Sequence, residues 1–285
     1  KAADKAGDSF VTVERLLLAL AIEKDNEAGR ALARSGVTPQ NVASLLKHAD
    51  TAMYHAKEFG RNNVQYFTAA MNAAASERLE LENDLHQALR SDQLYLLYQP
   101  QVHARDGRIS GIETLARWRH PKLGDVPPLK FIPIAEEAGL IEALGNWVLD
   151  EACRQMSTWR AAGVKGIRMA VNLSAQQLRS PNLVQSVATL LERHGLKGSD
   201  LELEITESVV MHDAETAVGM LRALKHMGVR LSIDDFGTGY SSLSYLKRFP
   251  IDILKIDKSF VRTLGVNDED TAIVHTIMAL AKSLR

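Results

Sequence analysis

The sequence predicts an α/β protein whose larger part is an incomplete TIM-like (β/α) barrel, preceded by helical N-terminal segments. From about residue 94 onward, short apolar runs typical of buried strands alternate with amphipathic helical stretches. This alternation indicates a mainly parallel sheet with helices outside it. The predicted strands also carry acidic or amide residues at or near their ends, which is where parallel barrels collect their functional groups.

Strand character is found in six segments, namely 94–102, 109–118, 168–173, 201–206, 230–234 and 253–256. Helices are predicted in the segments between and after them, for example at 147–162, 215–227, 241–248 and 271–284. Six strands are fewer than the eight that close a TIM barrel. The barrel expected here is therefore open.

The residues before this region divide into three predicted segments. Residues 1–42 are expected to form short helices, one of them after an N-cap at Thr12. Residues 43–67 contain a helical pattern, a glycine suited to a helix C-cap at Gly60, and an apolar run at 64–67 that predicts a strand. Residues 68–93 are rich in Ala, Glu and Leu and are predicted to form a linker helix.

Charge and cysteine content exclude several classes of function. The net charge is −1, from 34 basic and 35 acidic residues, so no overall basic field favours binding to long nucleic acids. No apolar run approaches the roughly 20 residues that a membrane-spanning helix needs. The single cysteine, Cys153, excludes an intrachain disulfide and agrees with a cytoplasmic location. It lies in a predicted amphipathic helix, which favours a small buried hydrophobic side chain over a reactive thiol.

Polar residues recur in the predicted strands, and they are Glu113, Asn172, Glu204, Asp234, Asp235 and Lys255. Any single carboxylate in an apolar strand could be paired within the core. If the set converges at one rim, however, four carboxylates and an amide would repel strongly unless cations neutralised them. Hard oxygen ligands of this kind favour Mg²⁺ or Mn²⁺.

Six short motifs follow one another in this region, and they are Tyr98-Gln99-Pro100, Glu113-Thr114-Leu115-Ala116-Arg117-Trp118, Asn172-Leu173-Ser174, Glu204-Ile205-Thr206-Glu207, the run Asp-Asp-Phe-Gly-Thr-Gly-Tyr-Ser-Ser-Leu at 234–243, and Leu254-Lys255-Ile256-Asp257. In this order they resemble the motifs of EAL-type cyclic di-GMP phosphodiesterases. The resemblance implies metal-dependent hydrolysis of cyclic di-GMP to linear pGpG, by a cyclic-guanylate-specific phosphodiesterase that uses Mg²⁺ or Mn²⁺.

The resemblance also implies a role for each matched residue. One metal ion would be bound by Glu113, Asn172, Glu204 and Asp234. Asp235 would serve a second metal ion, Lys255 would orient or activate the attacking water, and Glu207 would hold the loop after Asp235. The dinucleotide would contact Gln99, Leu115, Arg117 and Asp257.

Other outcomes follow from the same resemblance. The alternative to an enzyme is a non-catalytic module that binds cyclic di-GMP and transmits a signal, or an inactive fragment. The EAL family continues with two further strand units, one with a Glu motif and one with a Gln motif, whereas this sequence ends at Arg285. We therefore expect less activity than that of a complete EAL domain. A homodimer formed through the EAL domain is compatible with the resemblance.

Two shorter resemblances precede the EAL region. Residues 6–14, 16–20 and 28–40 resemble part of the N-terminal domain of a Clp-type disaggregase chaperone, which leaves a chaperone adaptor as a third function. Residues 46–67 resemble the last helix and strand of a GGDEF diguanylate cyclase domain. The sequence lacks the GGDEF signature, so cyclase activity is not expected. The predicted domains are thus 1–42, 43–67, 68–93 and 94–285.

Overall fold

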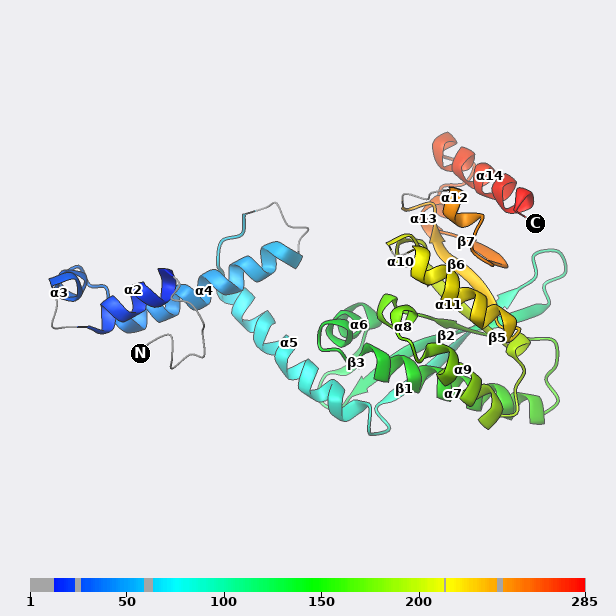
Figure 1. Ribbon diagram of the computed structural model, residues 1–285, viewed down its shortest axis with the longest axis horizontal. Helices are drawn as coiled ribbons and strands as arrows, with labels where there is room; N and C mark the ends of the chain where they lie inside the picture. The colour runs from blue at the N-terminus through cyan, green and yellow to red at the C-terminus, as the bar shows by residue number, and fades with distance from the viewer. Residues whose placement is uncertain (1–12, 24–26, 59–63, 213, 240–242, 285) are drawn as a thin grey trace. The chain divides into compact units, whose positions relative to one another are not determined.

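The computed structural model describes residues 13–23, 27–58, 64–212, 214–239 and 243–284 (Figure 1). The chain divides into two compact units, Lys1–Leu81 and Glu82–Arg285. The boundary between them falls within helix α5, Ala69–Ala88, which occupies the predicted linker helix.

The first unit is helical where it is described. It contains α2 (Val13–Ile22), α3 (Glu27–Arg34), α4 (Pro39–Glu58) and the first part of α5. Helix α4 runs without a break through the segment boundary predicted between residues 42 and 43. The predicted cap residues Thr12 and Gly60 lie outside the described residues.

The prediction of a strand at residues 64–67 is wrong, because these residues have irregular structure. A strand is stabilised by hydrogen bonds to a neighbour, and no strand is present in the described part of the first unit. Val64 and Tyr66 are 79% and 83% exposed. The Phe67 ring instead stacks on the His48 ring, with 3.7 Å between centroids.

The second unit contains one sheet in the order β1-β2-β4-β5-β6-β7, with β3 paired to β2 outside this order. The strands are β1 (Leu94–Val102), β2 (Ile109–His120), β3 (Gly124–Val126), β4 (Met169–Asn172), β5 (Leu201–Thr206), β6 (Arg230–Phe236) and β7 (Ile253–Ile256). β1 and β3 are antiparallel to β2, and the pairs β2–β4, β4–β5, β5–β6 and β6–β7 are parallel. β1 and β7 end the described sheet (Figure 1), which confirms the predicted α/β, open TIM-like fold.

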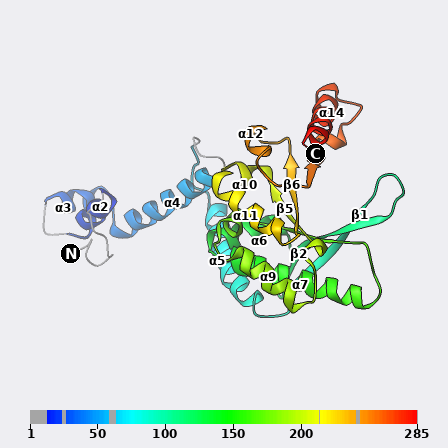
Figure 2. The same ribbon diagram turned by 45° about the vertical axis from the view of Figure 1, so that its right-hand side comes forward.

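Helices follow the parallel strands and cover the outer face of the sheet. They are α6 (Pro128–Glu137), α7 (Ile141–Ala161), α8 (Ala175–Arg179), α9 (Leu183–Arg193), α10 (Glu207–His212), α11 (Ala214–His226), α12 (Leu243–Leu246), α13 (Lys258–Arg262) and α14 (Asp268–Ser283), with a 3₁₀ turn at Gly198–Asp200. Helices α7, α9 and α11 pack side by side (Figure 2). No helix in the described ranges is both long and apolar enough to cross a bilayer.

Strand β5 shows how the core determines where polar groups lie. Leu201, Leu203 and Ile205 are at most 2% exposed and belong to the main hydrophobic core. Successive side chains of a strand point to opposite faces. Glu202 and Glu204 therefore point to the other face, which is the interior of the barrel.

Strand β2, which is central to the site, is longer than predicted. It continues to His120 because β3 pairs with its end through Trp118, Arg119 and His120. The His120 ring is buried and accepts hydrogen bonds at Nδ1 from the amides of Lys122 and Leu123, both 3.1 Å away. Its Nε2 therefore carries the proton and donates to Asp84 Oδ2 of α5 at 2.8 Å. The C-terminal part of α5 is thus attached to β2.

Candidate active site

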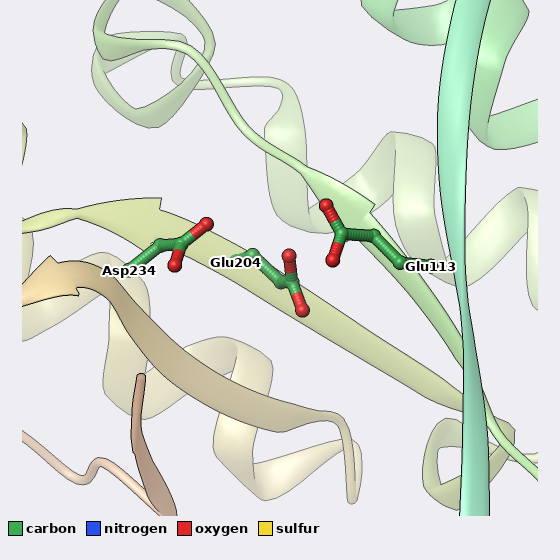
Figure 3. Close-up of side chains that lie close together, drawn as sticks. All are labelled: Glu113, Glu204 and Asp234. Carbon is green, nitrogen blue, oxygen red and sulfur yellow. The ribbon is translucent and has the colours of Figure 1, made fainter. Parts of the chain in front are cut away.

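Three carboxylates from three strands meet inside the sheet. Glu113 of β2, Glu204 of β5 and Asp234 of β6 each place an oxygen within 4.8 Å of the others. Figure 3 shows Glu204 between the other two side chains, with the carboxylates turned toward one another. These three residues, called the acidic cluster below, are three of the predicted metal ligands.

Lys255 of β7 binds all three members of the acidic cluster. Its Nζ donates to Glu204 Oε2 at 2.6 Å, to Asp234 Oδ2 at 3.1 Å and to Glu113 Oε2 at 3.2 Å. The ammonium group therefore occupies a position at which oxygens of all three carboxylates stabilise a positive charge.

Burial and charge act in opposite directions on these groups. Burial raises the pKa of Glu204 to about 7, although the hydrogen bond and charge of Lys255 oppose this shift. Burial by itself would lower the pKa of Lys255, but the hydrogen bond and charge of Glu204, with Asp234 and Glu113, raise it overall. The cluster thus keeps Lys255 protonated. Lys255 only partly offsets the cost of burying the Glu204 carboxylate, because the pKa of Glu204 stays above its usual value.

Two amide side chains complete the polar surroundings of the acidic cluster. Asn172, at the end of β4, donates from Nδ2 to Glu113 Oε1 at 3.3 Å, so this predicted ligand lies beside the cluster. Gln101 of β1 donates from Nε2 to Glu204 Oε1 at 3.2 Å. Gln101 is absent from the predicted site. Its only signal in the sequence is the two-residue spacing from Gln99, which places both side chains on one face of β1.

Asp235 is outside the acidic cluster but adjoins it through the backbone. Its φ angle is 52°, the one positive value of a non-glycine residue in the described ranges. Its amide donates to Asp234 Oδ1 at 3.0 Å. Burial raises the pKa of the Asp235 side chain, with further contributions from Asp234 and Asp257. Asp235 thus interrupts the regular strand conformation near the end of β6, where the register between β6 and β7 also shifts.

Glu207 contacts the loop that follows β6. Its side chain is buried, and Oε2 accepts a hydrogen bond of 2.8 Å from the amide of Gly237. A Cβ atom placed on Gly239 would lie 3.3 Å from Cδ and Oε1 of Glu207. The carboxylate and the described part of the loop, up to Gly239, are thus in close contact.

A cavity of about 350 Å³ is lined by residues including Leu115, Arg117, Pro128, Glu136 and Asn172. It adjoins the acidic cluster at Asn172, which donates to Glu113. Its size falls within the range of about 300–1,000 Å³ that is typical of ligand pockets. Arg117 donates from Nη1 to the carbonyl of Ala116 at 2.8 Å. No carboxylate among the described residues forms an ion pair with Arg117, so its charge is available to an anion in this cavity.

The structure does not bring the remaining predicted residues into direct contact with the acidic cluster. Gln99 is exposed and pairs with Glu113 across the β1–β2 ladder, and no side-chain hydrogen bond joins it to the described residues. Asp257 follows β7 and caps α13, with Oδ1 accepting from the amide of Ser259 at 2.8 Å. It reaches the site only through its effect on Asp235.

The donor set fits a hard divalent cation. It consists of three carboxylates within 4.8 Å of one another and the Asn172 amide beside them, which are the oxygen ligands that Mg²⁺ and Mn²⁺ prefer. One ammonium group now faces all three carboxylates. A divalent ion would balance the negative charge of the three carboxylates, which one ammonium group does not balance alone.

Known proteins share this fold and sequence. A profile of the EAL domain matches residues 82–285. The bifunctional diguanylate cyclase/cyclic di-GMP phosphodiesterase MucR of Pseudomonas aeruginosa is 52% identical over 240 residues, covering 84% of this chain and 35% of MucR. The cyclic di-GMP phosphodiesterase NbdA of the same organism is 44% identical over 240 residues, covering 84% of this chain and 31% of NbdA. The chain thus spans about a third of the length of these relatives.

Among solved structures, a complex of the P. aeruginosa MucR phosphodiesterase with c-di-GMP has a TM-score of 0.70 and 51% sequence identity. The similarity covers 72% of this chain and 83% of that structure. Because the profile match includes the whole described sheet and the acidic cluster, the chain belongs to the EAL domain family.

Proposed function

We propose that this chain hydrolyses cyclic di-GMP to linear pGpG with Mg²⁺ or Mn²⁺. The acidic cluster around Lys255 is the observation that carries the proposal. It has the ligand chemistry of a divalent metal site, and it occurs in a fold whose relatives include cyclic di-GMP phosphodiesterases. Asp235, next to Asp234 and turned by its positive φ angle, is the proposed ligand of a second ion.

The adjacent cavity is the proposed place for part of the dinucleotide. Arg117, which forms no ion pair with the described residues, provides a positive charge for a phosphate, and Leu115 and Pro128 provide apolar surface for a base. Gln99 and Asp257 are proposed as further contacts at the edges of the site. The MucR structure named above contains c-di-GMP, which supports this choice of ligand.

The reaction is a substitution at phosphorus. Bound metal ions would lower the pKa of a water molecule and stabilise the charge of the transition state. The water oxygen forms a bond to phosphorus, the bond from phosphorus to the ribose 3′-oxygen breaks, and a proton passes to that oxygen. Lys255 is proposed to orient the water, because in the acidic cluster it carries a proton and three bound oxygens fix its position. Glu207 is proposed to hold the loop after Asp235.

The proposal is tested by incubating the purified chain with cyclic di-GMP in Mg²⁺ or in Mn²⁺ and separating the products. Formation of pGpG that stops in EDTA and in Glu204→Gln is expected. Calorimetry in Ca²⁺ measures binding separately from hydrolysis. Binding with no turnover in either active metal would support the non-catalytic module instead, and neither binding nor turnover would support an inactive fragment.

The N-terminal resemblances are a separate proposal. We propose that residues 43–67 derive from the end of a GGDEF domain and residues 1–42 from a Clp-type N-terminal domain. The name of MucR combines a diguanylate cyclase with a phosphodiesterase, which supports a GGDEF segment before the EAL domain. A chain that starts at residue 69 tests whether these segments matter, because equal hydrolysis by both chains would exclude a catalytic contribution from them.

A further inference from the structure

We propose that Gln101 is a positioning residue for the metal site: its side-chain amide holds one oxygen of Glu204 so that the other faces the metal position. This inference rests on the proposed function, since it concerns how the acidic cluster binds a cation.

The two oxygens of Glu204 have different partners. Oε1 accepts from Gln101 Nε2 at 3.2 Å, and Oε2 accepts from Lys255 Nζ at 2.6 Å. The Glu204 side chain is 0% exposed, so water does not replace a lost partner. An unsatisfied buried acceptor costs about 1–3 kcal/mol, and more when it is charged. Gln101 therefore determines which way the carboxylate is turned.

Gln101 reaches Glu204 from a distant part of the sheet. β1 and β5 are separated by β2 and β4 in the strand order, so this hydrogen bond crosses the barrel interior. On β1, Gln99 pairs with Glu113 and Gln101 pairs with Gly111. Gln101 thus lies two cross-strand pairs further into the barrel than Glu113, on the same face of the sheet.

Gly111 provides the space that this side chain uses. A Cβ atom on Gly111 would lie 2.7 Å from Gln101 Oε1, which is closer than nonbonded atoms approach. It would also lie 3.4 Å from Cγ and 3.5 Å from the carbonyl oxygen of Arg168. Any other residue at position 111 would displace the Gln101 amide from its route to Glu204. The pair Gln101 and Gly111 therefore act as a unit.

The consequence for the metal is a loss of preorganisation. Without the Gln101 donor, Oε1 of the most buried carboxylate in the acidic cluster is left unsatisfied, and the carboxylate is held at Oε2 by Lys255 without a second donor on the opposite side. Residues that orient a metal ligand commonly change metal affinity by about 10–100-fold when they are replaced. We expect an effect of this size on Mn²⁺ binding, in the same direction for both members of the pair.

The two test variants are Gln101→Met, which keeps the length of the side chain but removes the donor, and Gly111→Ala. The matched control is Gln185→Met, at an exposed position of α9. Mn²⁺ affinity is measured by calorimetry and by electron paramagnetic resonance of free Mn²⁺, and the Tm is measured in EDTA. Mn²⁺ affinity about tenfold weaker or more in both test variants, with wild-type affinity in the control, is expected.

Two results would overturn the proposal, and only the second of them would also overturn the proposed function. Wild-type Mn²⁺ affinity in Gln101→Met, within about twofold, would overturn it even if the Tm in EDTA falls, because Gln101 would then only support the fold. If the wild-type chain binds no Mn²⁺ at all, the proposed function fails together with this inference. Gln101→Met gives the decisive result on its own if Gly111→Ala does not fold.

Discussion

Nζ of Lys255 lies 2.6 Å from Oε2 of Glu204, although β7 and β5 are separated in the sheet by β6. The contact spans the barrel interior, and it is accompanied by hydrogen bonds from the same nitrogen to Asp234 and Glu113. Lys255 is therefore at once the internal counterion of the acidic cluster and the proposed partner of the attacking water.

Replacing Lys255 separates these two roles. In Lys255→Met the three carboxylates face one another without a counterion, so we expect a lower Tm in EDTA and recovery of much of that loss in Mn²⁺. Hydrolysis of cyclic di-GMP should fall by about 100-fold or more, the size of effect typical for loss of a group that handles a proton. Lys258→Met, at an exposed position of α13, is the control. Unchanged Tm and rate would contradict the structure of the cluster.

Arg117 is expected to contribute to substrate binding more than to the rate of the bound complex. It lines the cavity and forms no ion pair with the described residues. Loss of a charged hydrogen bond is worth about 1.5–3 kcal/mol, so Arg117→Ala should weaken cyclic di-GMP binding in Ca²⁺ by roughly 10–100-fold and raise KM in Mg²⁺. The control is Arg193→Ala, an exposed arginine of α9. An unchanged Kd would exclude Arg117 from the phosphate site.

Glu207 is expected to affect catalysis through the loop after β6. Glu207→Ala removes the acceptor for the Gly237 amide, and we expect the rate of hydrolysis to fall by about 10–100-fold, as for other supports of a metal site. Gly239→Ala pushes a Cβ to 3.3 Å from the same carboxylate and should show a smaller loss in the same direction. Glu215→Ala, an exposed glutamate of α11, should retain full activity. A larger loss for Gly239→Ala than for Glu207→Ala would show that the loop acts independently of Glu207.

Cys153 is expected to be unreactive in the folded protein. Its thiol is 2% exposed, and burial, with a smaller contribution from the charge of Asp150, raises its pKa to about 12. Since the thiolate is the nucleophile, iodoacetamide at pH 8 should leave the native protein unmodified and label it fully in urea. Mass spectrometry of the intact protein measures this. Rapid labelling of the native protein at pH 8 would show that the helix carrying Cys153 opens readily.

Much of the second unit follows from local sequence patterns. The apolar runs and their two-residue alternation are sufficient to predict the six strands in the main order of the sheet, and with them which face of β5 carries Glu204. The polar positions at strand ends are equally local, because a parallel barrel brings such ends to one rim whatever the details of its packing. Short strands could not be predicted in the same way, because a strand of three or four residues depends on a partner elsewhere in the chain. For this reason β3 was not predicted, and the prediction of a strand at 64–67 is wrong.

The sequence by itself therefore determined the fold class, the family resemblance and the residues that could hold a metal. Only the tertiary structure decided which of their atoms meet. The register between strands places Lys255 among three carboxylates, leaves Asp257 on the adjoining turn, and directs Gln101 over Gly111 to Glu204. A local sequence pattern shows on which face of a strand a side chain lies. Contacts across a barrel also depend on the register of every strand between the two residues, and this register is established only when the whole sheet packs.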